Sequence, residues 1–240
     1  MLNIEELNKI ATKSQAQLVN VYREYCQNLF LSFLYQENDS NNIQFKGGTA
    51  LRIYYKSPRY SEDLDFSVFK LNKKQVEDKM LSVLFNLEKA NLKPELEESK
   101  ETGGGYLANL TLLIGENKVK ISLQASRRKM AYAQPNLVLI NNDFIPPYTI
   151  YLLNEKDLIK EKLEAAVTRS KPRDFFDIYF LLRKGSIGIE QISLLKQTVN
   201  IVEKSKINFR RELADFLPKN LHAVSADFPH IYLQEVKKYL

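Results

Sequence analysis

The sequence predicts an α+β (mixed α/β) fold, with a small mixed sheet and its helices in residues 1–152 and a helical domain in residues 153–240. Two observations support this prediction. Short apolar runs typical of β-strands recur up to residue 152, and apolar residues recur at helical spacing from residue 154 onward. The length of 240 residues is enough for one large domain or two small ones with hydrophobic cores. The boundary is expected near residues 151–155.

The chain begins with helical periodicity over residues 4–36, which predicts one helix. Polar residues at 37–42 indicate a turn, and IQFKGG then predicts a short strand that ends at Gly47 and Gly48. TALRIYY at 49–55 predicts a short helix, and LDFSVF at 64–69 predicts a second strand after a loop. A strand, a glycine turn and a helix follow one another in the order that a phosphate-binding turn requires.

Helical and strand periodicity then alternate. A helix is predicted at 73–91, and paired strands around the turn GENK are predicted at 106–114 and 118–126, with further strands at 138–140 and 149–152. The glycine run at 103–105 has no helix after it, so it is interpreted as a hairpin turn or a mobile loop rather than a nucleotide-binding loop.

The second half is predicted to be helical throughout. Helices are expected at 154–169, 172–185 and 189–203, followed by two weaker segments. Pro172 suits the first turn of its helix because proline has no backbone N–H to be satisfied there, and Gly185 suits the end of the same helix.

The composition favours a soluble globular protein, since 44% of the residues are apolar. No apolar run approaches the roughly 18 residues needed to cross a bilayer, and the N-terminus lacks the apolar core of a secretion signal. We therefore expect a cytoplasmic protein that does not bind a membrane. The 35 Lys and Arg residues against 29 Asp and Glu give a net charge of +6, which favours an anionic partner.

Basic residues gather in three clusters, and each cluster alone is explained well enough as a solvated surface. Together, in a chain with a phosphate site, they favour nucleic acid as the partner. The clusters are Arg127, Arg128 and Lys129; Arg169, Lys171 and Arg173; and Lys204, Lys206, Arg210 and Arg211.

The chain has few cysteine and histidine residues that could act as metal ligands or catalytic groups. Cys26 is the only cysteine, which excludes an internal disulfide and a cysteine-based zinc cluster, and its apolar neighbours at helical spacing indicate a buried inert thiol. His222 and His230 are the only histidines. Carboxylates remain as the candidate catalytic groups.

Asp63 and Asp65 are the strongest candidates. Side chains at i and i+2 of a strand point to the same face, so the two carboxylates would lie roughly 7 Å apart along the strand and could hold Mg²⁺. Upstream, Gly47 and Gly48 let the backbone approach a ligand closely, and Thr49 opens a helix whose N-terminus favours a phosphate. An isolated pair of this kind is more often a solvated strand edge; the preceding KGGTAL favours the functional interpretation.

Together with motifs farther along the chain, this segment resembles the AbiEii/AbiGii family of nucleotidyltransferase-like toxins in the DNA polymerase β type superfamily. The first family motif resembles KGGTALR at 46–52, and the second resembles S-x-D-L-D-F at 61–66. A family lysine on one helix and an R-D-x-x-D segment on the next correspond here to Lys162 and to Arg173, Asp174 and Asp177. The similarity covers residues 44–183.

The resemblance implies a Mg²⁺-dependent nucleotidyltransferase with a polymerase β-like core, whose helical domain completes the active-site cleft. Asp63 and Asp65 would be catalytic and would bind the metal. Lys162 would neutralise the triphosphate as pyrophosphate leaves, and Asp177 would orient Lys162 or contact the nucleotide. The implied nucleotide-binding residues are Lys46, Gly47, Gly48, Thr49, Arg52, Ser61, Arg173 and Asp174.

Four of these residues have alternatives. Asp174 would stabilise the dipole of its helix from the first turn, and Arg173 would pair with Asp174. Arg52 would turn toward the phosphates or lie on the surface. Ser61 would share the face of Asp63 if the strand begins early enough.

One position departs from the superfamily pattern. A third carboxylate is commonly present on a neighbouring strand, in a segment resembling K-I-D/E-I, whereas VKISLQ has Ser122 there. A serine is a poor Mg²⁺ ligand beside a carboxylate. A three-carboxylate site with two metal ions is therefore in doubt, as is the group that deprotonates the acceptor hydroxyl.

The resemblance implies a toxin of a bacterial toxin–antitoxin or phage-defence (abortive infection) system. The expected substrates are a nucleoside triphosphate and an RNA acceptor, with the tRNA 3′ end first among candidates, and the expected partner is an antitoxin encoded nearby. Two alternatives stay open. One is a phosphotransferase of the kinase type, and the other is an inactive member that binds nucleotide or RNA.

Overall fold

A computed structural model describes residues 2–128, 135–204 and 207–240. The chain divides into two compact units, which are described separately below. The first unit consists of Met1–Lys56 and Tyr60–Asn154, and the second consists of Ser57–Arg59 and Glu155–Leu240. The tripeptide Ser57–Arg59 therefore belongs to the helical unit, although its neighbours in sequence belong to the sheet unit.

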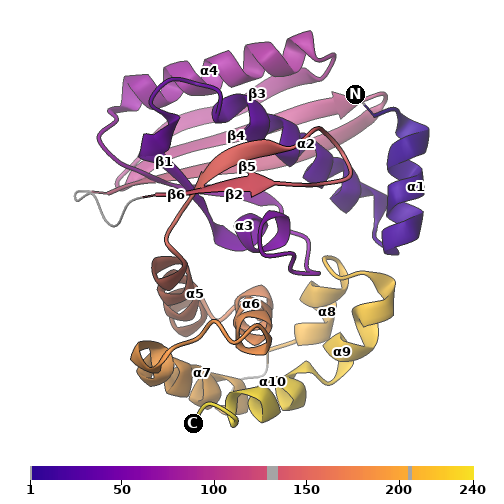
Figure 1. Ribbon diagram of the computed structural model, residues 1–240. Helices are drawn as coiled ribbons and strands as arrows, with labels where there is room; N and C mark the ends of the chain where they lie inside the picture. The colour runs from indigo at the N-terminus through magenta and orange to yellow at the C-terminus, as the bar shows by residue number, and fades with distance from the viewer. Residues whose placement is uncertain (1, 129–134, 205–206) are drawn as a thin grey trace. The chain divides into compact units, whose positions relative to one another are not determined.

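The first unit is built on one mixed sheet (Figure 1). Its strand order within the described residues is β3-β4-β5-β2-β1-β7-β6. The β2–β5 and β1–β7 pairs are parallel and the other four pairs are antiparallel, which confirms a mixed sheet. The strands are β1 (Ile43–Lys46), β2 (Asp63–Val68), β3 (Lys93–Thr102), β4 (Gly105–Ile114), β5 (Asn117–Arg127), β6 (Asn136–Ile140) and β7 (Tyr148–Leu152).

The central strands alternate between an apolar and a polar face, as the period of two in a strand requires. On β2, Leu64, Phe66 and Val68 are buried, and their cross-strand partners on β5 include Leu123 and Ala125. The helices α2 (Leu18–Leu34) and α4 (Lys73–Lys89) pack against each other and contact β5 and β3 respectively. The opposite face carries the polar residues of β2 and β5.

The helix predicted at 4–36 is two helices, so that prediction was wrong. The helix α1 (Ile4–Ser14) starts with a capping box between Asn3 and Glu6. It ends at Gln15, which adopts a left-handed conformation with φ of 53° and donates its N–H to carbonyls of the last turn. The helix α2 then begins after an extended Gln17. The apolar periodicity continues across this break because both helices carry buried apolar residues at helical spacing.

Most other predicted elements are present. The helix α3 (Gly47–Ile53) begins two residues earlier than expected, so Thr49 is its third residue. The glycine run forms the turn of a β3–β4 hairpin, one of its two interpretations. The edge strand β3 has the sequence KPELEESKET, which is charged and poor in apolar residues. Such a composition is typical of an edge strand that avoids pairing with another chain.

The second unit consists of helices packed around a cluster of aromatic rings. Pro172 lies in the first turn of its helix, and Gly185 follows the end of that helix with φ of 72°, as predicted. Phe228 contacts the rings of Phe176, Phe209 and Tyr232. The helices are α5 (Glu155–Arg169), α6 (Pro172–Arg183), α7 (Ile192–Lys204), α8 (Phe209–Ala214), α9 (His222–Ala226) and α10 (Phe228–Val236).

Two predictions about single features can be compared with the structure. Cys26 is fully buried on α2, and burial raises the pKa of its thiol, in agreement with an inert side chain. Among the described residues, each helix is too short or too polar to span a bilayer.

Candidate active site

Asp63 and Asp65 lie at the beginning of β2 and on the polar face of the sheet. The intervening Leu64 is fully buried on the other face, so the two carboxylates point to the same side, as the alternation predicted. Both side chains are partly exposed. They are therefore accessible to a ligand while the strand that carries them is held in the core.

Lys46 and Gly47 flank Asp65. Lys46 is the cross-strand partner of Asp65 on β1 and is largely buried, so its ammonium and the carboxylate belong to the same face. Gly47 has φ of 81°, a conformation that favours glycine. A Cβ at this position would lie 2.1 Å from Asp65 Oδ2. Gly47 is thus required for the position of the Asp65 carboxylate, a role that the sequence analysis did not assign to it.

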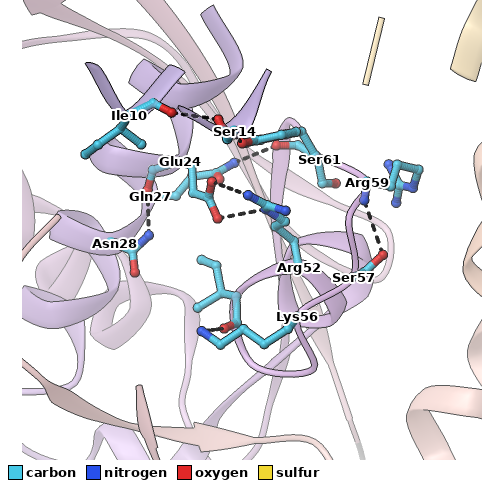
Figure 2. Close-up of polar contacts among 12 residues, drawn as sticks. Ile10, Ser14, Glu24, Gln27, Asn28, Arg52, Lys56, Ser57, Arg59 and Ser61 are labelled. Carbon is cyan, nitrogen blue, oxygen red and sulfur yellow. Dashed lines mark hydrogen bonds and ion pairs between the residues drawn. The ribbon is translucent and has the colours of Figure 1, made fainter. Parts of the chain in front are cut away.

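Thr49 fixes the beginning of the aspartate strand. Its buried hydroxyl donates a hydrogen bond to the backbone carbonyl of Asp63. The loop before Asp63 is held in turn by α2, because the Gln27 amide donates to the carbonyls of Ser61 (3.0 Å) and Glu62 (3.1 Å). Figure 2 shows Gln27 reaching the backbone at Ser61. The strand begins at Asp63, so Ser61 precedes it and the condition for a shared strand face is not met.

Arg52 pairs with a carboxylate of α2. Its Nε and Nη2 donate to Glu24 Oε1 (2.9 Å) and Oε2 (3.0 Å), as Figure 2 shows, and its guanidinium lies 3.9 Å from the ring centroid of Tyr60. Two parallel hydrogen bonds and a cation–π contact are strong, directional interactions. They tie α3 to α2 and to the segment that leads into β2. A phosphate contact by Arg52 stays a prediction.

The donors on the polar face suit a single Mg²⁺ ion. Ser122 and Gln124 of β5 are the cross-strand partners of Asp63 and Asp65, and neither β1 nor β5 contains an Asp or Glu. In the part of the chain that the structure describes, no group of three or more His, Cys, Asp or Glu side chains is arranged to hold a metal. Mg²⁺ is commonly held by one or two carboxylates together with waters and substrate phosphates. The two aspartates fit that arrangement.

A second group of charged residues lies within the helical unit. Lys162 on α5 and Asp177 on α6 form an ion pair, with 2.9 Å between Nζ and Oδ2. Arg59 donates from Nε to Asp177 Oδ1 (2.8 Å) and from Nη2 to Oδ2 (2.9 Å). Asp177 is 1% exposed and Arg59 is 2% exposed. One buried carboxylate is thus shared by two cations.

The surroundings of Asp177 stabilise its charged form. Burial raises the pKa of the Asp177 carboxyl, but the nearby Arg59 guanidinium and Lys162 ammonium outweigh burial and hold the pKa below its ordinary value of 3.8. Asp177 is therefore an anion at neutral pH and orients the Lys162 ammonium through a charge-assisted hydrogen bond.

The two remaining predicted residues of α6 have different partners. Asp174 is fully buried and accepts from Arg169 Nε (2.7 Å) and Nη2 (2.6 Å). Arg173 lies 3.8 Å from Glu212 of α8. The predicted alternative, in which Arg173 pairs with Asp174, is therefore wrong, because Arg169 occupies both carboxylate oxygens. Asp174 does lie in the first turn of α6, where a carboxylate stabilises the helix dipole.

The basic clusters have separate environments. Arg127 pairs with Glu101 at 3.2 Å, and Arg128 lies 3.3 Å from Ser67 Oγ. Lys171, Lys204, Arg210 and Arg211 are exposed. Lys129 and Lys206, which the sequence analysis included in these clusters, lie outside the described residues.

A known protein family matches the part of the chain that contains both the aspartates of β2 and the charged cluster around Asp177. The sequence model of the AbiEii family, described as nucleotidyl transferase AbiEii toxin, type IV TA system, matches residues 30–228. The chain belongs to the AbiEii family. Its fold is that of the nucleotidyltransferase toxins, and the family model spans both aspartates of β2 as well as Lys162 and Asp177. Membership in a type IV toxin–antitoxin family implies a cognate antitoxin.

Two solved structures share the fold, and one further protein is similar in sequence. JHP933 from Helicobacter pylori is 21% identical, with a TM-score of 0.61 over 93% of this chain and 94% of that chain. MenT4, the nucleotidyltransferase toxin Rv2826c from Mycobacterium tuberculosis H37Rv, is 19% identical, with a TM-score of 0.61 over 94% of this chain and 77% of that one. The uncharacterized protein aq_aa25 from Aquifex aeolicus (strain VF5) is 24% identical over 83% of this chain and 89% of its own length.

In this AbiEii chain, three residues that contact predicted site residues were missed by the sequence analysis. Arg59 was not identified because its partner Asp177 is 118 residues away and no local pattern links them. Glu24 contacts Arg52 and Gln27 contacts the backbone of Ser61, and both could have been identified from the sequence. They belong to a buried polar stripe at helical spacing in an otherwise apolar helix: Asn20, Arg23, Glu24, Gln27 and Asn28.

Proposed function

We propose that this AbiEii toxin transfers a nucleoside monophosphate from a nucleoside triphosphate to the 3′ end of an RNA, with tRNA as the first candidate, and thereby blocks translation. The observation that carries the proposal is the pair of partly exposed carboxylates, Asp63 and Asp65, on one face of β2. Lys46 on the same face supplies positive charge that favours a phosphate.

In the proposed reaction the acceptor hydroxyl forms a bond to the α-phosphorus while the bond from that phosphorus to the pyrophosphate breaks. Asp63 and Asp65 would hold Mg²⁺, which when bound neutralises phosphate charge and favours ionisation of the hydroxyl. These are the only carboxylates on β1, β2 and β5, and we assign the uptake of the acceptor proton to one of them. Lys162, oriented by Asp177, supplies positive charge for the leaving pyrophosphate.

An RNA acceptor is supported by the net charge of +6 and by the exposed basic residues of the helical unit. The test incubates the purified toxin with Mg²⁺, each of the four α-labelled triphosphates in turn, and total tRNA. A parallel sample uses tRNA whose 3′-terminal ribose has been opened by periodate. Label on intact tRNA and none on oxidised tRNA is the expected result. Equal labelling of both would show that the 3′ hydroxyl is not the acceptor.

The Gly47→Ala variant tests how strictly the carboxylate of Asp65 must be placed. The new Cβ would collide with Asp65 Oδ2, so we expect NMP transfer to fall about 10²-fold, the usual cost of misplacing a reacting group by an ångström. Initial rates with the preferred labelled triphosphate give the measurement.

Gly185→Ala is the matched control for this substitution. Gly185 also has positive φ, 72°, but no atom lies within 4 Å of where its Cβ would be. Both variants should lose about 1 kcal/mol of stability through backbone strain, while Gly185→Ala keeps wild-type transfer. Equal transfer rates in the two variants would show that the contact between Gly47 and Asp65 has no catalytic importance.

A further inference from the structure

Arg59 has no role in the mechanism so far, although it is the largest fully buried side chain in the described part of the protein. It lies in a short loop after Ser57 and Pro58, four residues before Asp63 in the sequence. Ser57 is also buried, and its hydroxyl accepts a hydrogen bond of 3.4 Å from the Arg59 backbone N–H. Pro58 restricts the backbone between them. Both features restrict the backbone of the loop that carries Arg59.

The guanidinium of Arg59 determines where the Asp177 carboxylate lies. Its two donors contact both carboxylate oxygens, whereas Lys162 has a single ammonium, which lies 2.9 Å from Oδ2. A planar fork of this kind fixes both the position and the plane of a carboxylate, which a single ammonium cannot do. With Arg59 in place, Oδ2 is directed at Lys162 Nζ. The position of the lysine ammonium thus depends on the arginine through the shared aspartate.

We propose that Arg59 is a positioning residue for nucleotidyl transfer: it holds the Asp177 carboxylate in place, and Asp177 in turn holds the Lys162 ammonium where pyrophosphate leaves. This inference rests on the proposed function. It assigns to Arg59 no contact with substrate. The consequence is that Arg59 affects catalysis only while Lys162 is present.

A double-mutant cycle tests that consequence. Arg59→Lys keeps the charge but loses the fork, and we expect it to lower kcat about tenfold or more, with a smaller change in the KM for the triphosphate. In the Lys162→Met background the same substitution should lower kcat by less than about twofold, because the side chain that Arg59 positions is already gone. A merely structural role would give the same factor in both backgrounds, and that result would overturn the proposal.

A second readout does not depend on activity. With ¹⁵N-labelled lysine, the Lys162 ammonium should give a slowly exchanging side-chain signal in the wild type, assigned by its loss in Lys162→Met. Arg59→Lys and Arg59→Gln should broaden or shift this signal, with the neutral Arg59→Gln serving if Arg59→Lys folds poorly. The control is Arg183→Lys. Arg183 lies on the same helix as Asp177, but its side chain is 61% exposed, so this substitution should leave the Lys162 signal unchanged.

The outcomes separate the two proposals. A Lys162 signal unaffected by either substitution at Arg59 overturns the positioning role whatever the enzyme assay gives. A wild-type protein that labels no RNA contradicts the proposed function instead, and the ammonium signal still reports on whether Arg59 positions Lys162.

Discussion

The double variant Asp63→Asn, Asp65→Asn is expected to lower the transfer of nucleoside monophosphate by about 10³-fold or more. Both carboxylates that could hold Mg²⁺ are lost at once. No acidic residue of β1 or β5 can replace them, since those strands contain none. The measurement is the initial rate of label transfer from an α-labelled triphosphate to RNA, at saturating Mg²⁺, for the wild type and the double variant.

The double variant should remain folded. The hydrogen bond from Thr49 reaches the backbone of Asp63 and not its side chain, and asparagine has the size of the aspartate that contacts Gly47. We expect the free energy of unfolding to change by about 1 kcal/mol at most. Asp78→Asn, an exposed position on α4, is the matched control and should transfer at the wild-type rate. Wild-type transfer by the double variant would refute the assignment of Asp63 and Asp65.

Asp177→Asn is expected to have the largest effect on stability. Asparagine keeps the shape of the side chain but removes the negative charge that the buried Arg59 and Lys162 share. Removing one partner of a buried ion pair typically costs about 3–5 kcal/mol. Chemical denaturation, followed by the loss of helical signal, measures the difference. Transfer should fall as well, because Lys162 is no longer held.

The stabilisation from Asp177 should also depend on pH. The pKa of Asp177 is lower in the folded protein than its ordinary value of 3.8. The contribution is therefore fully present above that value and is lost as the pH falls through the folded pKa. The wild type should lose stability more steeply than Asp177→Asn below about pH 4, and the two curves should run parallel at neutral pH.

Asp174→Asn provides the comparison on the same helix. Asp174 is just as buried but binds Arg169 alone, whose side chain is 48% exposed. Its loss leaves one partly solvated cation, so we expect a smaller destabilisation than for Asp177→Asn. If the two variants are equally stable, the sharing of Asp177 by two cations contributes nothing to the free energy of unfolding.

The sequence predicted the placement of Asp63 and Asp65 on one face of a strand, and the structure confirms it, because that placement is local. Asp63 and Asp65 are two residues apart, and the strand period alone places them on one face. The glycine turn precedes them by one short helix. The family pattern implied that Ser122 lies on a neighbouring strand, and the register shows that its partner there is Asp63.

The cluster of Arg59, Lys162 and Asp177 in the helical unit depends on contacts between residues far apart in the sequence. Nothing in the residues around Arg59 indicates that it belongs to the helical unit and pairs with Asp177. Likewise, the break at Gln15 was missed because left-handed backbone at a non-glycine residue leaves no mark in the apolar pattern. The charged strand β3 forms only because β4 provides an edge for it to pair with.

The most direct test of the account compares two labels in one assay. RNA is incubated with Mg²⁺ and the preferred triphosphate, labelled on either the α- or the γ-phosphate, with the wild type and with the asparagine double variant at 63 and 65. The account predicts α-label on RNA with the wild type, no γ-label, and neither label with the double variant. Label from the γ-phosphate alone would show phosphoryl transfer of the kinase type and contradict the proposed chemistry.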